Sequence, residues 1–418
     1  MNRQAVPGHD AYAALRIPSV RRYLTGRIAW ALGNNMLATA IGWQLYDRTG
    51  STLALGAVGL AQVIPVVVLA LPVGRLVDRH NRRDMAVASV ATFAACVLAL
   101  AAFSYFRAPV WTAYLILFVM GVAQSAHGPA TSALFAQICP IEVYENANAW
   151  RSTTVQLFML VGPVVGGVAL VASGATLTYL LAAATVVAFL VALLRIPRPP
   201  SPVPPPVEPG SEARELRAGL HFVFGNQLML SAITLDLFAV LFGGVTALLP
   251  VFARDILHVD ARGLGVLRAA PALGAFVLAF LTTRLPPWRH AGRVLLYTVA
   301  GFAVVTIVFG LSRSFWLSAV MLALAGGFDN VSALIRMTLE QLVTPEALRG
   351  RVSAVNYVFV GLSNEMGEAE SGAAAWAFGP VAAVAGGGVA ALLVVVLVAW
   401  RWPALRRLGR LSDLRAQA

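Results

Sequence analysis

The stretch Gly74-Arg75-Leu76-Val77-Asp78-Arg79-His80-Asn81-Arg82-Arg83 separates two long apolar segments, near 54–76 and 85–105. Four of its residues are arginines, and a single aspartate stands among them. Arginine-rich loops between apolar helices stay on the cytoplasmic side of a membrane. The stretch therefore predicts a tight cytoplasmic loop between two membrane-spanning helices, and it sets the direction in which both helices cross.

Further apolar segments lie on both sides of this loop, each bounded by charged, glycine or proline residues. A helix needs about 20 mostly apolar residues to cross the hydrocarbon core of a bilayer. By this measure the sequence predicts twelve membrane-spanning helices, near 22–46, 54–76, 85–105, 110–138, 147–172, 175–195, 227–253, 261–284, 292–312, 315–341, 351–376 and 379–400.

The composition of the whole chain supports this interpretation. Of its 418 residues, 59% are hydrophobic and only 12% are charged. A soluble domain carries about 25% charged residues, so soluble and disordered classes are excluded. The formal net charge of +12 could indicate nucleic-acid binding in a soluble protein. Here an excess of arginine on one side of a membrane explains the charge, and we expect no nucleic-acid partner.

The positions of the arginines predict the orientation of the chain. With both termini inside, 23 of the 31 basic residues fall in the two tails and the cytoplasmic loops, and five fall in the outer loops. The remaining three, Arg27, Arg268 and Arg336, lie within predicted spans. This asymmetry predicts a multi-pass membrane protein with both termini in the cytoplasm.

A proline-rich stretch, RPPSPVPPP at 198–206, divides the twelve segments into two sets of six. Proline cannot continue a helix, so the stretch predicts a semi-rigid extended linker. Residues 211–217 then predict an N-capped amphipathic helix at the membrane interface. The expected domains are a six-helix bundle at 1–195, a linker with an interfacial helix at 196–226, and a six-helix bundle with a basic tail at 227–418.

The glycine, the Asp-Arg pair and the two adjacent arginines of the 74–83 loop resemble the signature of the major facilitator superfamily between its second and third helices. The resemblance implies an all-α membrane protein with twelve helices in two six-helix bundles. It also implies a cytoplasmic latch between the bundles, formed here by Gly74, Asp78, Arg79, Arg82 and Arg83. The alternative is a loop whose arginines only set the topology.

The fifth segment contains Gly162-Pro163-Val164-Val165-Gly166-Gly167, which resembles an element of exporters in this superfamily. Small residues let helices approach closely, and proline kinks a helix. The element favours efflux, while ordinary Gly/Pro packing is the alternative. Further stretches resemble the branch of enterobactin-type siderophore exporters, also called transmembrane secretion effectors; they lie at 128–130, 146–149, 349–353 and 363–372. This resemblance implies a multi-pass protein of the bacterial cytoplasmic (inner) membrane.

Charged residues inside the spans are functional candidates because each costs at least about 2.5–3.5 kcal/mol at the centre of a helix. Asp329 and Arg336 lie two turns apart on one face of the tenth segment, and Glu340 continues that face. Proton coupling or substrate binding is one interpretation of these three residues, and a static buried ion pair is the other. Asp236 and Arg268 are further candidates for the same roles.

The eleventh segment carries Glu365 and Glu368 on one face, with Glu370 pointing elsewhere. Two carboxylates on one face repel each other, so this pair is expected to bind and release a proton. Glu365 lies about 21 Å along the helix from Arg351, past the membrane midplane. We therefore expect Glu365 and Glu368 to act in coupling, with solvated carboxylates at the outer mouth as the alternative.

The first six segments offer only uncharged or weakly basic candidates. The first segment contains Asn34 and Asn35, and the fourth contains Gln124 and His127. A hydrated histidine could titrate near neutral pH, although a lone membrane histidine is more often a hydrogen-bonded packing residue. Many proton-coupled drug exporters of the superfamily carry an acid in the first helix. This chain has none there, so their coupling site does not carry over.

The sequence contains no pattern of an enzyme or of a cofactor site. It has no glycine-rich phosphate loop followed by lysine, no metal-ligand spacing and no nucleophile elbow. Its two cysteines, Cys96 and Cys139, lie far apart in apolar segments. We therefore expect no catalytic residues, no cofactor and no metal.

These observations predict a secondary active transporter that works by alternating access of two bundles around a midplane cavity. The expected activity is proton-coupled export of a small or medium-sized amphipathic molecule, such as a siderophore or a drug. The expected partners are this substrate, protons and the lipid bilayer, and we expect a monomer. Two alternatives stay open: a lysophospholipid or lipid flippase of the same fold, and a non-transporting membrane sensor or scaffold.

Overall fold

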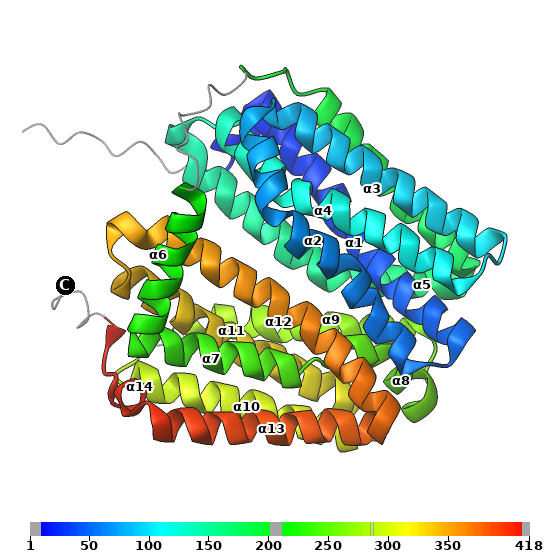
Figure 1. The fold of residues 1–418 in the computed structure, drawn as a ribbon. Helices are drawn as coiled ribbons and strands as arrows, with labels where there is room; N and C mark the ends of the chain where they lie inside the picture. Colours follow the sequence, from blue (N-terminus) through cyan, green and yellow to red (C-terminus); the bar gives the residue numbers. More distant parts are fainter. Residues whose placement is uncertain (1–9, 201–210, 285, 287, 412–418) are drawn as a thin grey trace, which may run out of the picture.

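The structure is a computed structural model that describes residues 10–200, 211–284, 286 and 288–411. These residues form helices and contain no strand (Figure 1). The α-helices are α1 (Pro18–Thr49), α2 (Thr52–Arg79), α3 (Arg82–Tyr105), α4 (Val110–Ile138), α5 (Tyr144–Leu194), α6 (Ser211–Gly225), α7 (Gln227–Phe242), α8 (Leu249–Val251), α9 (Ala261–Thr282), α10 (Ala291–Leu311), α11 (Phe315–Val343), α12 (Arg349–Phe378), α13 (Pro380–Arg401) and α14 (Pro403–Arg407).

Tight turns at glycines reverse the chain between successive long helices. Gly50, Gly174 and Gly379 have φ values of 59°, 75° and 86°, a region of backbone conformation that glycine adopts without steric cost. Gly174 interrupts α5, so its 51 residues form two arms on either side of this turn. The predicted fifth and sixth segments, 147–172 and 175–195, correspond to these two arms.

The predicted seventh segment, 227–253, is not one continuous helix. Helix α7 ends at Phe242, and the chain continues through the 3-10 helix η3 (Val245–Leu248), α8 and a π-helical turn, η4 (Phe252–Ile256). The break lies at the Gly243-Gly244 pair, directly after Phe242. A Cβ on Gly244 would lie 2.6 Å from the carbonyl oxygen of Gly367 on α12, so glycine lets these two backbones touch. Apolar length indicated a span here but gave no sign of the break.

Within the described residues, nine helices are long and apolar enough to cross a membrane. They include both arms of α5 counted together and α7 counted with the segment up to Ile256. Helices α1 and α12, of 32 and 30 residues, are not among the nine. Both correspond to predicted spans, but polar and charged residues lower their apolar content.

The buried core divides between the two halves of the chain. One cluster of buried residues comes almost entirely from residues 14–196, and two others come entirely from residues 223–411. The fourth cluster joins the halves, because Tyr46 and Leu55 pack there with residues of α8 and α9. Between the halves, α5 packs along α9 and α2 packs along α12. In Figure 1, α12 crosses the centre of the molecule beside α2.

The first and last described residues lie at the same end of the molecule, on the left in Figure 1. A helix, α6, is present at this end where the sequence predicts one after the linker, although the side chains of 211–216 and all of 201–210 lie outside the described residues. Helix α6 packs on the start of α12, where a Cβ on Gly219 would lie 2.9 Å from the carbonyl oxygen of Arg351. We call this end the terminal end and the opposite end, with the turn at Gly50, the distal end.

Candidate functional site: a charged cavity between the two halves

A cavity of about 460 Å³ lies between the two halves of the chain. Both halves line it, α1, α2 and α5 on one side and η3, α9, α11 and α12 on the other. Its lining includes Asn35, Ala38, Ile41, Gly42, Leu55, Val58, Gly59, Gln62, Gln156, Met159, Pro163, Thr246, Ala247, Arg268, Pro271, Ala272, Ala275, Gly326, Asp329, Glu365 and Glu368. A mostly apolar cavity with a few polar groups is typical of a small-molecule site.

The wall formed by the first half is uncharged. Its polar side chains are three amides, Asn35 on α1, Gln62 on α2 and Gln156 on α5. Asn35 donates a hydrogen bond of 2.9 Å to the carbonyl oxygen of Ala31, which fixes the amide on the cavity side of α1. These groups can donate to a ligand or accept from it, but they cannot balance a charge.

The wall formed by the second half carries the ionisable groups. Glu365 and Glu368 lie on one face of α12, as their spacing predicts. A Cβ on Gly59 of α2 would lie 3.2 Å from a carboxylate oxygen of Glu365, so this glycine leaves room for the carboxylate. Arg268 on α9 attracts Glu368 electrostatically, and its Nε has no hydrogen-bond partner among the described residues.

Arg336 joins two other candidates, Asp236 and Asp329. Its guanidinium group lies 2.7 Å from the carboxylate of Asp236 on α7 and 3.8 Å from that of Asp329. It also donates a 2.8 Å hydrogen bond to the hydroxyl of Ser332. The side chain of Asp236 is 8% exposed and that of Asp329 is 54% exposed, so Asp329 forms the cavity side of this cluster.

Glu340 does not belong to this cluster, in contrast to the predicted stripe of Asp329, Arg336 and Glu340. Its two carboxylate oxygens accept hydrogen bonds from Ser353 at 2.5 Å and from Asn356 at 2.7 Å, both on α12. Helical spacing placed the three residues on one face, but α12 passes closer to Glu340 than Arg336 does. Glu340 therefore fastens α11 to α12.

A smaller cavity of about 190 Å³ is lined entirely by residues of the second half of the chain. Asp329 and Glu368 line both cavities. The rest of its lining is mostly apolar and includes Val240, Val305, Phe302, Phe309, Met321, Leu322 and Ala325. We call this space the side cavity. The two carboxylates thus border both spaces.

At the distal end the two halves are in direct contact. A Cβ on Gly167 of α5 would lie 2.2 Å from the carbonyl oxygen of Ala261, and one on Gly265 of α9 would lie 2.6 Å from that of Pro163. Gly162 and Gly166 approach α1 in the same way, since Cβ atoms there would lie 2.5 Å from Asn35 Cβ and 2.9 Å from Met36 Cα.

Polar contacts reinforce this distal closure. The hydroxyl of Tyr46 donates to the carboxylate of Asp255, and Arg254 lies 2.9 Å from Asp47. Both links join the end of α1 to η4 across the two halves. The sequence predicts Arg254 only as an outer-loop residue. Its pairing with Asp47 depends on how the two halves pack, which the residues around Arg254 do not indicate.

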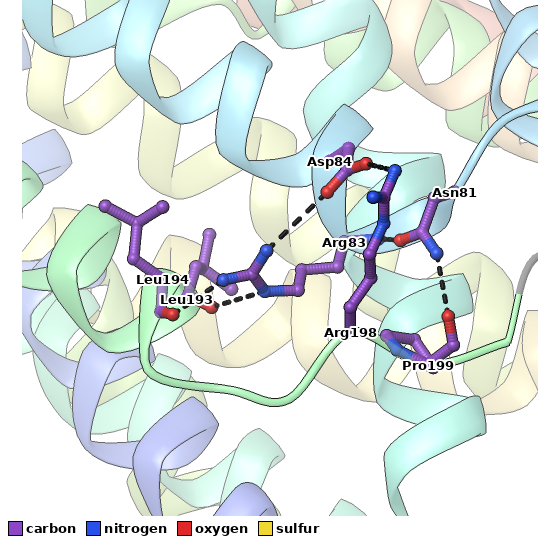
Figure 2. Close-up of polar contacts among 7 residues, drawn as sticks. All are labelled: Asn81, Arg83, Asp84, Leu193, Leu194, Arg198 and Pro199. Atoms are coloured by element: carbon purple, nitrogen blue, oxygen red, sulfur yellow. Dashed lines mark hydrogen bonds and ion pairs between the residues drawn. The ribbon is translucent and has the colours of Figure 1, made fainter.

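The loop between α2 and α3 binds the end of α5 and the start of the linker (Figure 2). Arg83 donates from Nε to the carbonyl oxygen of Leu193 at 3.1 Å and from Nη2 to that of Leu194 at 2.6 Å. An arginine at the last turn of a helix satisfies its free carbonyl groups.

The linker is attached to the same loop. Asn81 donates to the carbonyl oxygen of Pro199 at 2.7 Å, and Arg198 pairs with Asp84 (Figure 2). The loop therefore fastens the first residues of the linker to the first half of the chain.

For three other residues of the predicted latch, Gly74, Arg79 and Arg82, the structure describes the surroundings. No atom lies within 4 Å of a Cβ placed on Gly74, so no close helix contact occurs there. Arg79 is exposed, and the Nε of Arg82 is buried without a hydrogen-bond partner among the described residues. The side chain of Asp78 lies outside the described residues.

Several polar candidates do not line the main cavity. His127 is 8% exposed, stacks on Trp30 at 3.9 Å and lies 3.0 Å from a guanidinium nitrogen of Arg27, so it is packed inside the first half. Asn34, Gln124 and Glu370 are also absent from its lining. Gln156 and Thr246 line the cavity but are not among the residues predicted from the sequence. A lone amide in an apolar segment is the signal that could have identified Gln156.

Within the described residues, no group of three histidine, cysteine or acidic side chains could hold a metal ion. Cys96 and Cys139 are both free and buried.

Comparisons with known proteins agree with this architecture. A family model of the Major Facilitator Superfamily matches residues 24–367. The Enterobactin exporter EntS of Shigella flexneri is 28% identical over 395 residues, 93% of each chain. The protein of the same name from Escherichia coli O1:K1 / APEC is 27% identical over 396 residues, again 93% of each chain.

Solved structures share the fold. The POT family transporter PepTSo has a TM-score of 0.74 at 12% identity, covering 93% of this chain and 98% of that one. A bacterial homologue of the human lysosomal transporter Spinster, crystallised in an inward-facing and unoccupied conformation, has a TM-score of 0.68 at 14% identity and covers 98% of both chains. At these identities the likeness concerns the fold alone.

Proposed function

Because this chain belongs to the Major Facilitator Superfamily and is a multi-pass membrane transporter rather than an enzyme, we propose that it exports a small or medium-sized amphipathic molecule in exchange for protons. The single observation that carries the proposal is the cavity of about 460 Å³ between the two halves, with carboxylates on one wall. The named activity of the relatives, enterobactin export, supports the direction of transport.

The proposed architecture has twelve spans. The nine apolar helices become twelve when the two arms of α5 are counted separately and α1 and α12 are added. This count makes two bundles, 1–195 and 227–418, which are joined by 196–226. The terminal end then faces the cytoplasm, because the arginine-rich loops lie there.

In this proposal the two bundles rock about the cavity. The contacts of α5 with α9 and of α1 with η4 close the distal, outer end. The open surroundings of Gly74 fit a loop that is not engaged as a latch in this state. These features support an inward-facing state, in which substrate enters from the cytoplasm, and separation of the distal contacts would release it outside.

Glu365 and Glu368 are the proposed proton carriers. Both line the cavity, and within the described residues neither has an arginine at ion-pair distance. A carboxylate inside the membrane without a paired cation is stabilised when it binds a proton. Because both carboxylates line the cavity, they can exchange that proton with it. Asp329 is accessible to the same space, whereas Asp236 is tied to Arg336.

The first test compares metabolites inside and outside cells that make the wild-type protein, no protein, or the double variant Glu365→Gln with Glu368→Gln. We expect at least one compound to accumulate in the medium only with the wild type. Glu370→Gln is the matched control, since Glu370 lies on the same helix but not on the cavity lining.

Everted vesicles then test proton coupling with that compound. Its addition is expected to dissipate a preformed pH gradient in wild-type vesicles and not in vesicles with the double variant. Export that continues at the same rate after a proton ionophore collapses the gradient would reject coupling. A metabolite profile that is the same with and without the protein would reject export.

A further inference from the structure

The ionisable groups around the cavity are unevenly distributed by wall and by sign. The wall of the first half contributes none. The second half contributes four carboxylates and two guanidinium groups to the main cavity and the small space behind Asp329; they are Asp236, Asp329, Glu365, Glu368, Arg268 and Arg336. In the fully ionised state this set carries two uncompensated negative charges.

The geometry shows where the excess lies. Arg336 lies near both Asp236 and Asp329, and it is much closer to Asp236. Arg268 attracts Glu368 from across the cavity. Glu365 lies near Glu368 on its own helix. Of the other elements that line the cavity around Glu365, α9 contributes Arg268, whereas α2 and η3 contribute only uncharged groups. The excess therefore lies on Glu365 and Asp329, the carboxylates that face open space.

An uncompensated carboxylate at this depth is costly, so the cavity must take up positive charge. Protons can supply it, and so can a ligand with a cationic group. An anionic ligand would add to the excess, because the ionisable wall of the main cavity carries three carboxylates and one guanidinium group, Arg268.

The side cavity gives this ligand a second property. It shares Asp329 and Glu368 with the lining of the main cavity, and its lining also includes Phe302, Phe309 and Met321. Aromatic faces attract cations, and the apolar lining favours a hydrocarbon or ring group. A molecule that places its charge between the carboxylates can thus place an apolar group in the side cavity.

We infer that the transported compound is a lipophilic cation, with its cationic group bound among Asp329, Glu365 and Glu368 and its apolar part in the side cavity. This inference rests on the proposed export function and assigns its substrate class. Each bound cation displaces a proton from the carboxylates into the water, which keeps the charge of the cavity balanced. A polyanionic siderophore would add to the negative charge of this cavity.

Two probes of the same shape and opposite charge test the inference. Tetraphenylphosphonium is a permanent lipophilic cation, and tetraphenylborate is its anionic counterpart. Equilibrium dialysis with purified full-length protein in detergent should show saturable binding of the cation and only nonspecific binding of the anion. In weakly buffered solution, adding the cation should also release protons, which a pH indicator detects.

Variants locate the binding. Glu365→Gln should raise the dissociation constant of the cation at least tenfold and reduce proton release, while Glu370→Gln should change neither. Ala325→Leu, which fills the side cavity, should weaken cation binding without reducing the protons released per bound cation. Size-exclusion profiles identify any variant that does not fold, and Glu368→Gln replaces Glu365→Gln in that case.

The result that overturns the inference is saturable binding of tetraphenylborate as tight as that of the cation, or cation binding that survives both carboxylate changes. If an anionic compound is exported and the cation is not bound, the substrate class is wrong and the export function stands. If the cation binds as expected but the metabolite comparison shows no export, the export function is wrong and the binding site stands.

Discussion

Arg336 is shared by two carboxylates that come from different helices. It pairs with Asp236 of α7 at 2.7 Å, and with a more distant Asp329 on its own helix at 3.8 Å. Its side chain is 15% exposed, so the pairing takes place mostly out of water. Removing one partner of a buried ion pair is far more destabilising than replacing the whole pair, because the remaining charge loses its compensation.

We therefore expect Arg336→Gln to destabilise the protein by about 3–5 kcal/mol. Thermal unfolding in detergent should show a lower midpoint than the wild type. Adding Asp236→Asn to Arg336→Gln should recover part of the loss, since it removes the unpaired carboxylate. Arg293→Gln is the control, because Arg293 is exposed at the start of α10 and should change stability by less than about 0.5 kcal/mol. An unchanged midpoint for Arg336→Gln would show that the cluster is not a structural tie.

At the scale of helices, the contact between α5 and α9 depends on two glycines. The position of a Cβ on Gly167, 2.2 Å from the carbonyl oxygen of Ala261, is sterically impossible without movement. Backbone atoms cannot rotate away as a side chain could, so one of the two helices must shift. This contact is part of the closed distal end. A side chain at position 167 would push α5 and α9 apart and so oppose closure.

Gly167→Ala is therefore expected to favour the outward-open state. The measurement is labelling of Thr246→Cys, a position on the cavity wall, by a membrane-impermeant maleimide added outside cells. Labelling should be at least fivefold faster with Gly167→Ala than without it. Gly386→Ala on α13 is the matched control, because no atom lies within 4 Å of a Cβ there. Equal labelling rates for Gly167→Ala and the control would contradict the assignment of this contact to the gate.

For the whole molecule, the link of α1 to η4 bridges the two halves at the distal end. Arg254 and Asp47 lie 2.9 Å apart, with side chains 42% and 56% exposed. Exposed ion pairs contribute about 0–1 kcal/mol and are screened by salt. A methyl group at Gly167 would clash with the backbone of α9. That substitution should therefore affect closure more strongly than loss of this ion pair does.

Asp47→Asn should accordingly change the outside labelling rate of Thr246→Cys by less than about fivefold. Charge reversal, Asp47→Arg, should increase labelling further by setting two cations against each other. The swap of Asp47→Arg with Arg254→Asp should return labelling toward the wild-type rate. The differences should shrink in 1 M salt. Failure of the swap to restore the rate would show that Asp47 and Arg254 do not act as a pair.

Much of the secondary structure could be predicted from the sequence because the signals are local. The segment predicted at 110–138 is α4 to the residue, and that predicted at 261–284 is α9 within two residues. The length of an apolar segment and the positions of proline, glycine and arginine determine where a helix begins and ends without contacts from distant residues. The exception is the break after Phe242, which depends on α12 passing against Gly244, and no feature of the local sequence encodes that neighbour.

The sequence by itself determined that this is a helical membrane protein, where its helices run and which residues carry buried charge. Only the tertiary structure decided which of those charges meet. Helical periodicity places Asp329, Arg336 and Glu340 on one face. In the packed structure, however, Arg336 pairs most closely with Asp236 of α7, and Glu340 accepts hydrogen bonds from α12. The physical reason is that spacing along a helix is set by its own backbone, whereas the partner of a side chain is set by whichever helix lies against that face.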